Sequence, residues 1–420
     1  MKQGIVSIAA SGKSISVYRI LIKLISLCGL ALFIPAGLAA DIVITMEYQP
    51  DSSRPNDYTF KNLTPVTGYC AYYPRACGPG EYSVKVPGRD IIKMLDNTSS
   101  DLKKHHGYVA TDSTTKGLLL SDINDPGKAV SARFRWVLTG LTYERINEGD
   151  GNLGWALLGL HRPEGECTNI GGGSAPNVFI HAARFPEQLA SCGARLQDPY
   201  QGNVRINDFS IGYRIDMPNP FFLSNGEYQG EVVFKASELK APNTYSMGAI
   251  DYGDADEIRF IIKVSIRHVF HYRFPPGSER VRLTPPQGWG QWINGARVPD
   301  SLRKEVPFTL STSREFKVWM QCEHTVGEGC GLRNQTTAEI VPLDIRVTLP
   351  GLVTGSGPVH QYLLTNNRFT GNPFAPYFTY VANSRSTLHF RVNKPAVEQM
   401  VKQPGSSWRG GVTLIFDSKI

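Results

Sequence analysis

The chain has 420 residues, of which 41% are hydrophobic and 19% charged, so it can bury a core and is neither disordered nor a coiled coil. Its 41 Gly, 28 Pro, 19 Phe and 18 Tyr favour short strands joined by turns and argue against an all-α fold. The formal net charge is +7, but four of the positive charges lie in the first 40 residues, which contain no Asp or Glu. The remaining charge of +3 (7 − 4) is too small to indicate a nucleic-acid partner.

Residues 1–40 have the features of an export signal peptide. A basic stretch precedes an apolar run at 24–34, and small residues follow this run. The run has 11 residues, whereas a helix that spans a bilayer needs about 20, so a cleaved signal is favoured over a membrane anchor. Cleavage after Ala39 or Ala40 would leave a mature chain that starts near Asp41.

Strand-like alternation of apolar and polar residues is typical of region 41–274, which we predict to be an N-terminal β domain. Apolar residues recur at every second position in 130–138, 209–217 and 260–266, and the last of these segments continues to Phe270. Each of these strands would bury one face and leave the other wet, as strands of antiparallel sheets commonly do. A short helix is expected at 89–95.

Residues 275–305 contain paired prolines and several glycines but little alternation, which indicates a linker. Alternation resumes in the C-terminal domain, residues 306–420, in three segments: 316–320, 343–349 and 388–392. A short helix is expected at 395–401. The sequence therefore predicts an all-β protein with two β-sandwich domains.

A further apolar row lies close to the end of the chain. Val412, Leu414 and Phe416 alternate with more polar residues, and the last residue is Ile420. Such a strand can complete its own sandwich, or it can pair backbone to backbone with a strand of another chain. The alternation by itself leaves both interpretations open.

Six of the seven cysteines follow the export signal. They form three local pairs: Cys70 and Cys77, Cys167 and Cys192, Cys322 and Cys330. Six cysteines allow 15 pairings, and we take the local pairs as disulfides because an even number of cysteines in an exported chain indicates disulfide bonds. A zinc site is the alternative, but the sequence has no C-x-x-C spacing and its nine His do not cluster near the cysteines. No metal or cofactor is expected.

The sequence offers no catalytic motif but does offer candidate binding residues. It lacks the G-x-S-x-G nucleophile elbow, the H-E-x-x-H zinc pair and the G-x-x-x-x-G-K-[ST] phosphate loop, so we do not expect an enzyme. A sugar or peptide site combines aromatic side chains with a few polar groups. Tyr72 and Tyr73 lie in the loop of the first cysteine pair, and Trp155 and His161 precede the loop of the second. For Trp155, a place in the core beside a disulfide is the favoured alternative.

Several stretches, together with the terminal strand, span nearly all of the expected mature chain: FKNLTP at 60–65, GYC at 68–70, FPPGS at 274–278, PPQGW at 285–289 and PLDIRVTLPG at 342–351. In their order and spacing they resemble the two-domain tip adhesins of chaperone–usher fimbriae. The resemblance is closer to a divergent group of fimbrial tip proteins of Gram-negative bacteria.

The resemblance implies a fold and a route of assembly. The C-terminal domain would be an immunoglobulin-like pilin sandwich that lacks its last strand. A periplasmic chaperone would lend a strand beside 412–416 and hold the carboxylate of Ile420. The outer-membrane usher would then exchange this strand for the N-terminal extension of the adjacent pilin. Since no such extension precedes the first domain after residue 41, a place at the fimbrial tip is implied. One departure is that many such domains join their first two strands by a disulfide, whereas Cys322 and Cys330 follow a strand.

The favoured hypothesis is a tip adhesin that is exported through the periplasm to the cell surface. Its N-terminal domain, residues 41–274, would bind a glycan or protein receptor. The alternative within the same pathway is a structural tip initiator that binds no ligand. A third hypothesis, a secreted hydrolase with a β-sandwich module, requires two carboxylates about 5–10 Å apart in a cleft.

Overall fold

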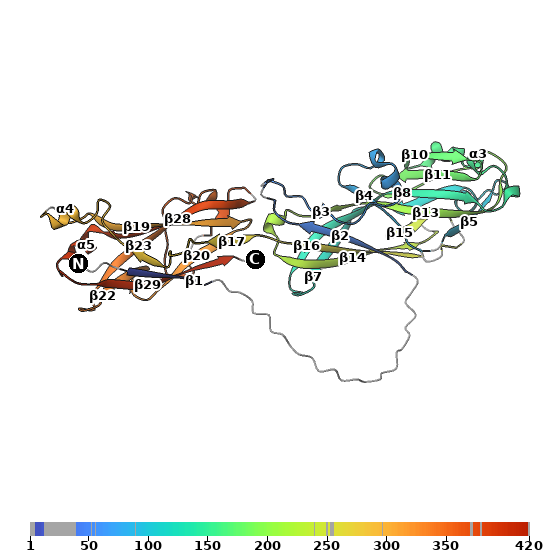
Figure 1. The fold of residues 1–420 in the computed structure, drawn as a ribbon. Coiled ribbons are helices and arrows are strands. Elements are labelled where there is room, and N and C mark those ends of the chain that lie inside the picture. Colours follow the sequence, from blue (N-terminus) through green and yellow to red (C-terminus); the bar gives the residue numbers. More distant parts are fainter. Residues whose placement is uncertain are drawn as a thin grey trace, which may run out of the picture. The chain divides into compact units, whose positions relative to one another are not determined.

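The computed structural model describes these residues: 5–11, 39–51, 53–54, 56–88, 90–238, 240–248, 251–252, 256–295, 297–369, 373–378 and 380–418. The chain divides into two compact units, each built mainly of β-strands (Figure 1). The N-terminal unit comprises Leu27–Tyr48 and Thr59–Ile266; the C-terminal unit comprises Met1–Ser26, Gln49–Tyr58 and Arg267–Ile420. The predicted all-β class with two domains is confirmed. Within the described residues, no helix is long and apolar enough to cross a membrane.

The strands of the N-terminal unit form one hydrogen-bonded network of 15 strands over a single large core. They are β2 (Ala39–Tyr48), β3 (Lys61–Asn62), β4 (Glu81–Lys85), β5 (Ile91–Asp96), β6 (Gly107–Asp112), β7 (Lys116–Asp122), β8 (Ala129–Arg145), β9 (Glu164–Gly165), β10 (Thr168–Ala175), β11 (Val178–Arg184), β12 (Leu189–Ala194), β13 (Gln201–Asp216), β14 (Gly226–Ala236), β15 (Thr244–Ser246) and β16 (Glu257–Ile266). The long strands β8 and β13 pair with each other along most of their length.

Short helical turns connect these strands: α1 (Tyr69–Tyr72), η1 (Pro74–Ala76), α2 (Leu102–His105), η2 (Glu148–Asp150), α3 (Leu153–Ala156), η3 (Leu158–His161) and η4 (Pro220–Phe222). The alternation at 130–138 is confirmed as part of β8, where Phe134 and Trp136 are buried. The helix expected at 89–95 is wrong. Ile91, Lys93 and Leu95 are buried at every second position of strand β5, and a short apolar run does not by itself distinguish helix from strand.

The C-terminal unit is a second, separate β core. Its elements are β1 (Ile5–Ser11), β17 (Phe270–Arg273), β18 (Arg280–Arg282), α4 (Gly290–Ile293), β19 (Ser301–Thr312), β20 (Phe316–Cys322), β21 (Thr325–Val326), β22 (Gly329–Asn334), β23 (Ile340–Thr348), β24 (Leu352–Thr354), β25 (Gly357–Pro358), β26 (Tyr362–Leu363), β27 (Ala375–Pro376), β28 (Val381–Asn393), α5 (Lys394–Val401) and β29 (Trp408–Ser418). The strand order is β17-β19-β28-β23-β22-β29-β1-β18, with β20 also paired to β29. The helix expected at 395–401 is confirmed as α5.

The predicted linker contains regular elements that pack on the C-terminal unit. Strand β18 and helix α4 lie within 275–305, and Val281 and Leu283 belong to the C-terminal core. Strand β17, which precedes this region, pairs with β19. The last segment of the N-terminal unit ends at Ile266, and the chain continues in the C-terminal unit from Arg267.

The terminal strand predicted at 412–416 is β29, and it has neighbours on both edges. Strand β20 pairs antiparallel along one edge. Strand β1 runs parallel along the opposite edge, from Ile5 beside Arg409 to Ser11 beside Ile415 (Figure 1). It also pairs with β18. Strand β1 thus joins β29 to β18. Ile420 lies outside the described residues.

All three local disulfides are present: Cys70–Cys77, Cys167–Cys192 and Cys322–Cys330. The last of them joins the end of β20 to β22. Among the residues that the structure describes, no group of three or more His, Cys, Asp or Glu side chains is arranged to hold a metal ion. Two of the disulfides cross-link the N-terminal unit, and the third cross-links the C-terminal unit.

Candidate ligand-binding site

A hollow of about 340 Å³ lies in the N-terminal unit between helix α1 and strands β8, β11 and β13. We call it the tyrosine hollow. Its lining residues are Gly68, Tyr69, Tyr72, Tyr73, Gly140, Leu141, Thr142, Ile180, Asp208 and Ser210. Pockets that hold small ligands measure about 300–1,000 Å³, so this volume suits a ligand of one or two rings.

The start of α1 is held very close to the sheet. The Tyr69 amide donates to Ser210 Oγ at 3.1 Å, and the Cys70 amide donates to Ser83 Oγ at 2.9 Å. Gly68 has a φ of +70°, and a Cβ there would lie 2.3 Å from the Ser210 Cβ. A Cβ on Gly140 would lie 2.8 Å from the Tyr69 Cβ. Because both positions lack a side chain, α1 can pack directly on β8 and β13.

The far end of the same loop is held by an ion pair and the disulfide. Arg184 donates to both carboxylate oxygens of Glu81 at 2.8 and 2.7 Å, and to the Ala76 carbonyl at 2.9 Å. The hydrogen bond from Arg184 keeps the pKa of Glu81 below its usual range. Cys70 and Cys77 close the loop. The loop that carries the tyrosines is therefore fixed at both ends.

The tyrosines differ in their exposure. Tyr69 is buried, its hydroxyl donates to the Ile170 carbonyl at 3.3 Å, and burial raises its pKa. The Tyr73 ring is tilted against the Tyr69 ring, with 4.9 Å between centroids, and remains 40% exposed. Tyr72 is 67% exposed. The two candidate tyrosines thus line one hollow, and one of them rests on a buried ring.

Asp208 contributes the charged group of the hollow. The register between β13 and β8 shifts between Asn207 and Ser210, so Asp208 lies in a β-bulge. Its φ is +48°, a left-handed conformation that costs a non-glycine residue on the order of 1–3 kcal/mol. Its carboxylate is 2.6 Å from Lys85 Nζ. Bulges and backbone outliers of this kind concentrate at binding and active sites.

Trp155 and His161 lie outside the tyrosine hollow. Trp155 is 60% exposed, so the expectation that it packs in the core is wrong. Asn152 Oδ1 accepts the Trp155 amide hydrogen at 3.1 Å and begins helix α3, which places Trp155 at a second hollow of about 160 Å³. The His161 ring contacts the Phe179 ring, with 5.3 Å between centroids, and lines neither hollow. The four candidates therefore do not form one site.

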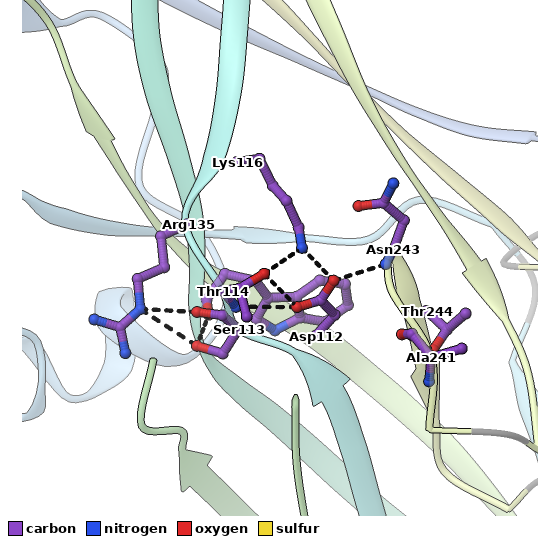
Figure 2. Close-up of polar contacts among 9 residues, drawn as sticks. Asp112, Ser113, Thr114, Lys116, Arg135, Ala241, Asn243 and Thr244 are labelled. Carbon is purple, nitrogen blue, oxygen red and sulfur yellow. Dashed lines mark hydrogen bonds and ion pairs between the residues drawn. The ribbon is translucent and has the colours of Figure 1, made fainter. Parts of the chain in front are cut away.

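Polar side chains also cluster around the buried carboxylate of Asp112 in this unit. Figure 2 shows Lys116 and the backbone amide of Asn243 directed at the Asp112 carboxylate. Thr114 donates to the other oxygen from its hydroxyl, at 2.7 Å, and from its amide, at 3.1 Å. Burial acts to raise the pKa of Asp112, but these hydrogen bonds outweigh it and keep the pKa below its usual range. Both oxygens are thus already engaged, which indicates a structural role.

Several residues that build the tyrosine hollow escaped the sequence analysis. Arg184 and Glu81 are 103 positions apart, and no local pattern links them. Asp208 follows Asn207 within an otherwise strand-like segment, and Asn and Asp tolerate left-handed backbone better than other side chains do. That dipeptide was the available signal for a bulge.

Comparisons with known proteins give structural matches only. No protein-family model matches the sequence, and no curated protein matches it. The chain is similar to a chain of the chaperone–tip adhesin complex of CFA/I fimbriae, with 10% identity, a TM-score of 0.24, and coverage of 90% of this chain and 96% of that one. It is similar to a mutant of the enterotoxigenic E. coli CFA/I adhesin CfaE, with 8% identity, a TM-score of 0.22, and coverage of 90% and 98%.

A third similar structure is the CsuC–CsuE chaperone–tip adhesion subunit pre-assembly complex of the archaic chaperone–usher Csu pili of Acinetobacter baumannii. The identity is 9%, the TM-score is 0.24, and the match covers 91% of this chain and 99% of that one.

Proposed function

We propose that this chain is a non-enzymatic fimbrial tip adhesin whose C-terminal unit lacks one strand once the export signal is removed. The observation that carries the proposal is the position of β1. This strand consists of Ile5–Ser11, which lie inside the predicted signal at 1–40, yet it pairs with Arg409–Ile415 along one edge of β29. Cleavage after Ala39 or Ala40 would remove the strand and leave that edge open.

The open edge would need another strand. Backbone amide and carbonyl groups along Arg409–Ile415 would lose their partners in β1, and β18 would lose its connection to β29. Buried apolar side chains, among them Val412 and Leu414, lie along β29. An uncovered apolar edge of this kind promotes aggregation unless a further strand pairs with it.

Assembly would follow from that requirement. A periplasmic chaperone would supply a strand beside β29, the usher would take over the complex, and an adjacent pilin would provide the permanent strand. The N-terminal unit would carry the ligand site at the cell surface, with the tyrosine hollow as the place of contact. The contact proposed for the C-terminal carboxylate of Ile420 falls outside the described residues.

The experiment compares three chains expressed with their disulfides intact: residues 41–420, residues 5–420, and residues 5–420 with Ile8→Pro. Proline removes a backbone donor from the middle of β1, so the third chain is a matched control for the strand rather than for its length. We expect the first and third chains to aggregate alone and to become soluble one-to-one complexes with a fimbrial chaperone. Residues 5–420 should be soluble without it.

A soluble monomer of 41–420 that is as stable as 5–420 would refute the missing strand. If the chain is captured by chaperone and usher but its N-terminal unit binds no cell surface or ligand, the structural tip initiator is the correct function. Hydrolysis of a glycan by the purified chain would favour the secreted hydrolase instead.

A further inference from the structure

Exposed arginines flank the edge of β29 that β1 covers. Arg409 lies on β29, Arg333 lies opposite it on β22, and Arg282 lies on β18. The residues on either side of each arginine in its strand are buried. Because successive side chains of a strand point to opposite faces, the three arginines lie on the solvent face of the sheet. We call them the arginine row.

Strand β1 fills a gap in the arginine row. The backbone of Ile5 lies beside Arg409 of β29 on one side and beside Arg282 of β18 on the other. Since neighbouring strands lie about 4.8 Å apart, the backbones of the two arginines are roughly 10 Å from each other across this gap. A solvent-facing side chain at this position of the intervening strand is therefore within reach of two guanidinium groups.

The arginine row has no carboxylate partner in the part of the chain that the structure describes. Arg333 and Arg409 lie directly opposite each other, and like charges in that arrangement destabilise a sheet. A negative side chain in the gap would offset this repulsion and would also pair with Arg282, because opposite charges on neighbouring strands stabilise a sheet. The gap is thus suited to an acidic residue.

The next solvent-facing position along the same strand has a different environment. In the register of β1 this position is Ser7, which lies beside Gly411 of β29 and Arg280 of β18. Glu323 Oε2 accepts the Gly411 amide hydrogen at 2.7 Å and would lie 3.1 Å from a Cβ on Gly411. An acidic side chain here would meet the Glu323 carboxylate as well as Arg280. The preference for negative charge is therefore confined to the gap in the arginine row.

We propose that the strand which a periplasmic chaperone lends to β29 carries an aspartate or glutamate on its solvent face, in the gap of the arginine row. This carboxylate selects the register of the lent strand. A slip of one residue would turn it to the core face, and a slip of two toward the end of β29 would place it beside Glu323. The proposal rests on the function proposed above, because it names the chemistry of the partner strand.

The first test uses the full chain, produced without export so that β1 remains attached. The unfolding of the C-terminal unit is measured for Ile5→Glu, Ile5→Gln and Ile5→Lys. At low salt we expect the unfolding constant of Ile5→Glu to be about three- to tenfold smaller than that of Ile5→Gln, and that of Ile5→Lys to be larger. In 1 M salt, where the Debye length is about 3 Å, these differences should shrink. Ser7→Glu, compared with Ser7→Gln, should gain less than Ile5→Glu does.

Two double variants locate the effect. Arg282→Gln with Arg409→Gln removes both sides of the gap and should abolish the preference for Glu over Gln at position 5. Arg303→Gln with Arg391→Gln is the matched control, because these exposed arginines also lie directly opposite each other, on β19 and β28. The control should retain the preference.

The second test addresses the partner strand itself. Residues 41–420 are co-expressed with the fimbrial chaperone that captures this chain, and the lifetime of the one-to-one complex is measured by displacement with excess tagged chaperone. We expect the complex of the Arg282→Gln, Arg409→Gln chain to dissociate about three- to tenfold faster. The complex of the Arg303→Gln, Arg391→Gln chain should dissociate like that of the unmodified chain.

The proposal is overturned if Ile5→Glu and Ile5→Gln are equally stable, or if all three complexes have the same lifetime. Ile8→Pro in the full chain distinguishes this result from a failure of the proposed function. If Ile8→Pro destabilises the C-terminal unit but Glu and Gln are equivalent at position 5, the missing strand stands and only its charge preference is lost. If Ile8→Pro has no effect, β1 does not complete the unit, and both proposals fail.

Discussion

His181 is a buried ionisable side chain without a hydrogen-bond partner among the described residues. It lies in β11, and neither ring nitrogen has a protein partner. Burial, with a smaller contribution from the nearby His161, lowers the pKa of His181 to about 3. In an unfolded chain the pKa of histidine is about 6.5. The folded N-terminal unit therefore keeps this ring neutral under conditions in which the unfolded chain would bind a proton.

This difference predicts a loss of stability in acid. Between about pH 6.5 and pH 3 the unfolded state binds the proton more readily, so the free energy of unfolding falls as the pH falls. Stability from this group is fully present above about pH 6.5, and the slope approaches about 1.4 kcal/mol per pH unit inside the window. We expect His181→Phe, which has a similar shape and does not titrate, to flatten the dependence measured by urea denaturation between pH 6.5 and 4. An equal slope in both proteins would show that the ring is already protonated or solvated in the folded state.

The two faces of strand β29 should differ in their importance for chaperone capture. Leu414 is fully buried on β29, whereas the neighbouring Thr413 is half-buried on the opposite face. Leu414→Asp buries an unpaired carboxylate beside the proposed open edge of β29, which costs several kcal/mol, on the order of a lost ion pair in a core. We expect Leu414→Asp to abolish capture by a fimbrial chaperone in a co-purification assay. Thr413→Asp, the matched control, should be captured like the unmodified chain, and equal capture of both variants would contradict a chaperone-pairing role for this face.

The same elements show what the sequence could predict. Period-two alternation identified β8, β20 and β29 because an apolar row buries one face of a strand. It failed at β5, where Lys93 occupies a buried position. Its ammonium donates to the carbonyls of Lys103, Met247 and Gly248 at 2.8, 2.6 and 3.2 Å. Two of these partners are distant in sequence, and no local sequence pattern indicates the third. A lysine in a strand is predicted to be exposed unless its buried hydrogen-bond partners are known.

Only some residues of the candidate site could be predicted from the sequence. Tyr72 and Tyr73 were predictable because a short disulfide loop cannot bury two adjacent rings. Asp208 was not predictable, because its position depends on a bulge where β13 pairs with β8. Arg184 was not predictable either, because its partner Glu81 is 103 positions away in the sequence. Local patterns thus located the rings of the hollow, but its polar groups depend on the register of the sheet.

At the scale of the whole molecule, the two units have separate cores and should respond separately to a missing strand. A chain of residues 41–420 kept soluble at low concentration should show two thermal transitions in calorimetry. A synthetic peptide with the sequence of Ile5–Ser11 can pair with β29 and β18, so it should raise only the transition of the C-terminal unit. At a peptide concentration of 100 times its Kd, mass action stabilises the folded unit by about 2.7 kcal/mol.

The control is the same peptide with Ile8→Pro, which cannot donate from the centre of the strand and should have no effect. A ligand that binds in the tyrosine hollow should instead raise the transition of the N-terminal unit alone. If the Ile5–Ser11 peptide shifts both transitions or neither, then β1 does not complete the C-terminal unit in the way proposed. Separate shifts would instead establish that assembly and ligand binding reside in two independently stabilised parts of one chain, so that a donor strand can be exchanged without disturbing the site that holds the ligand.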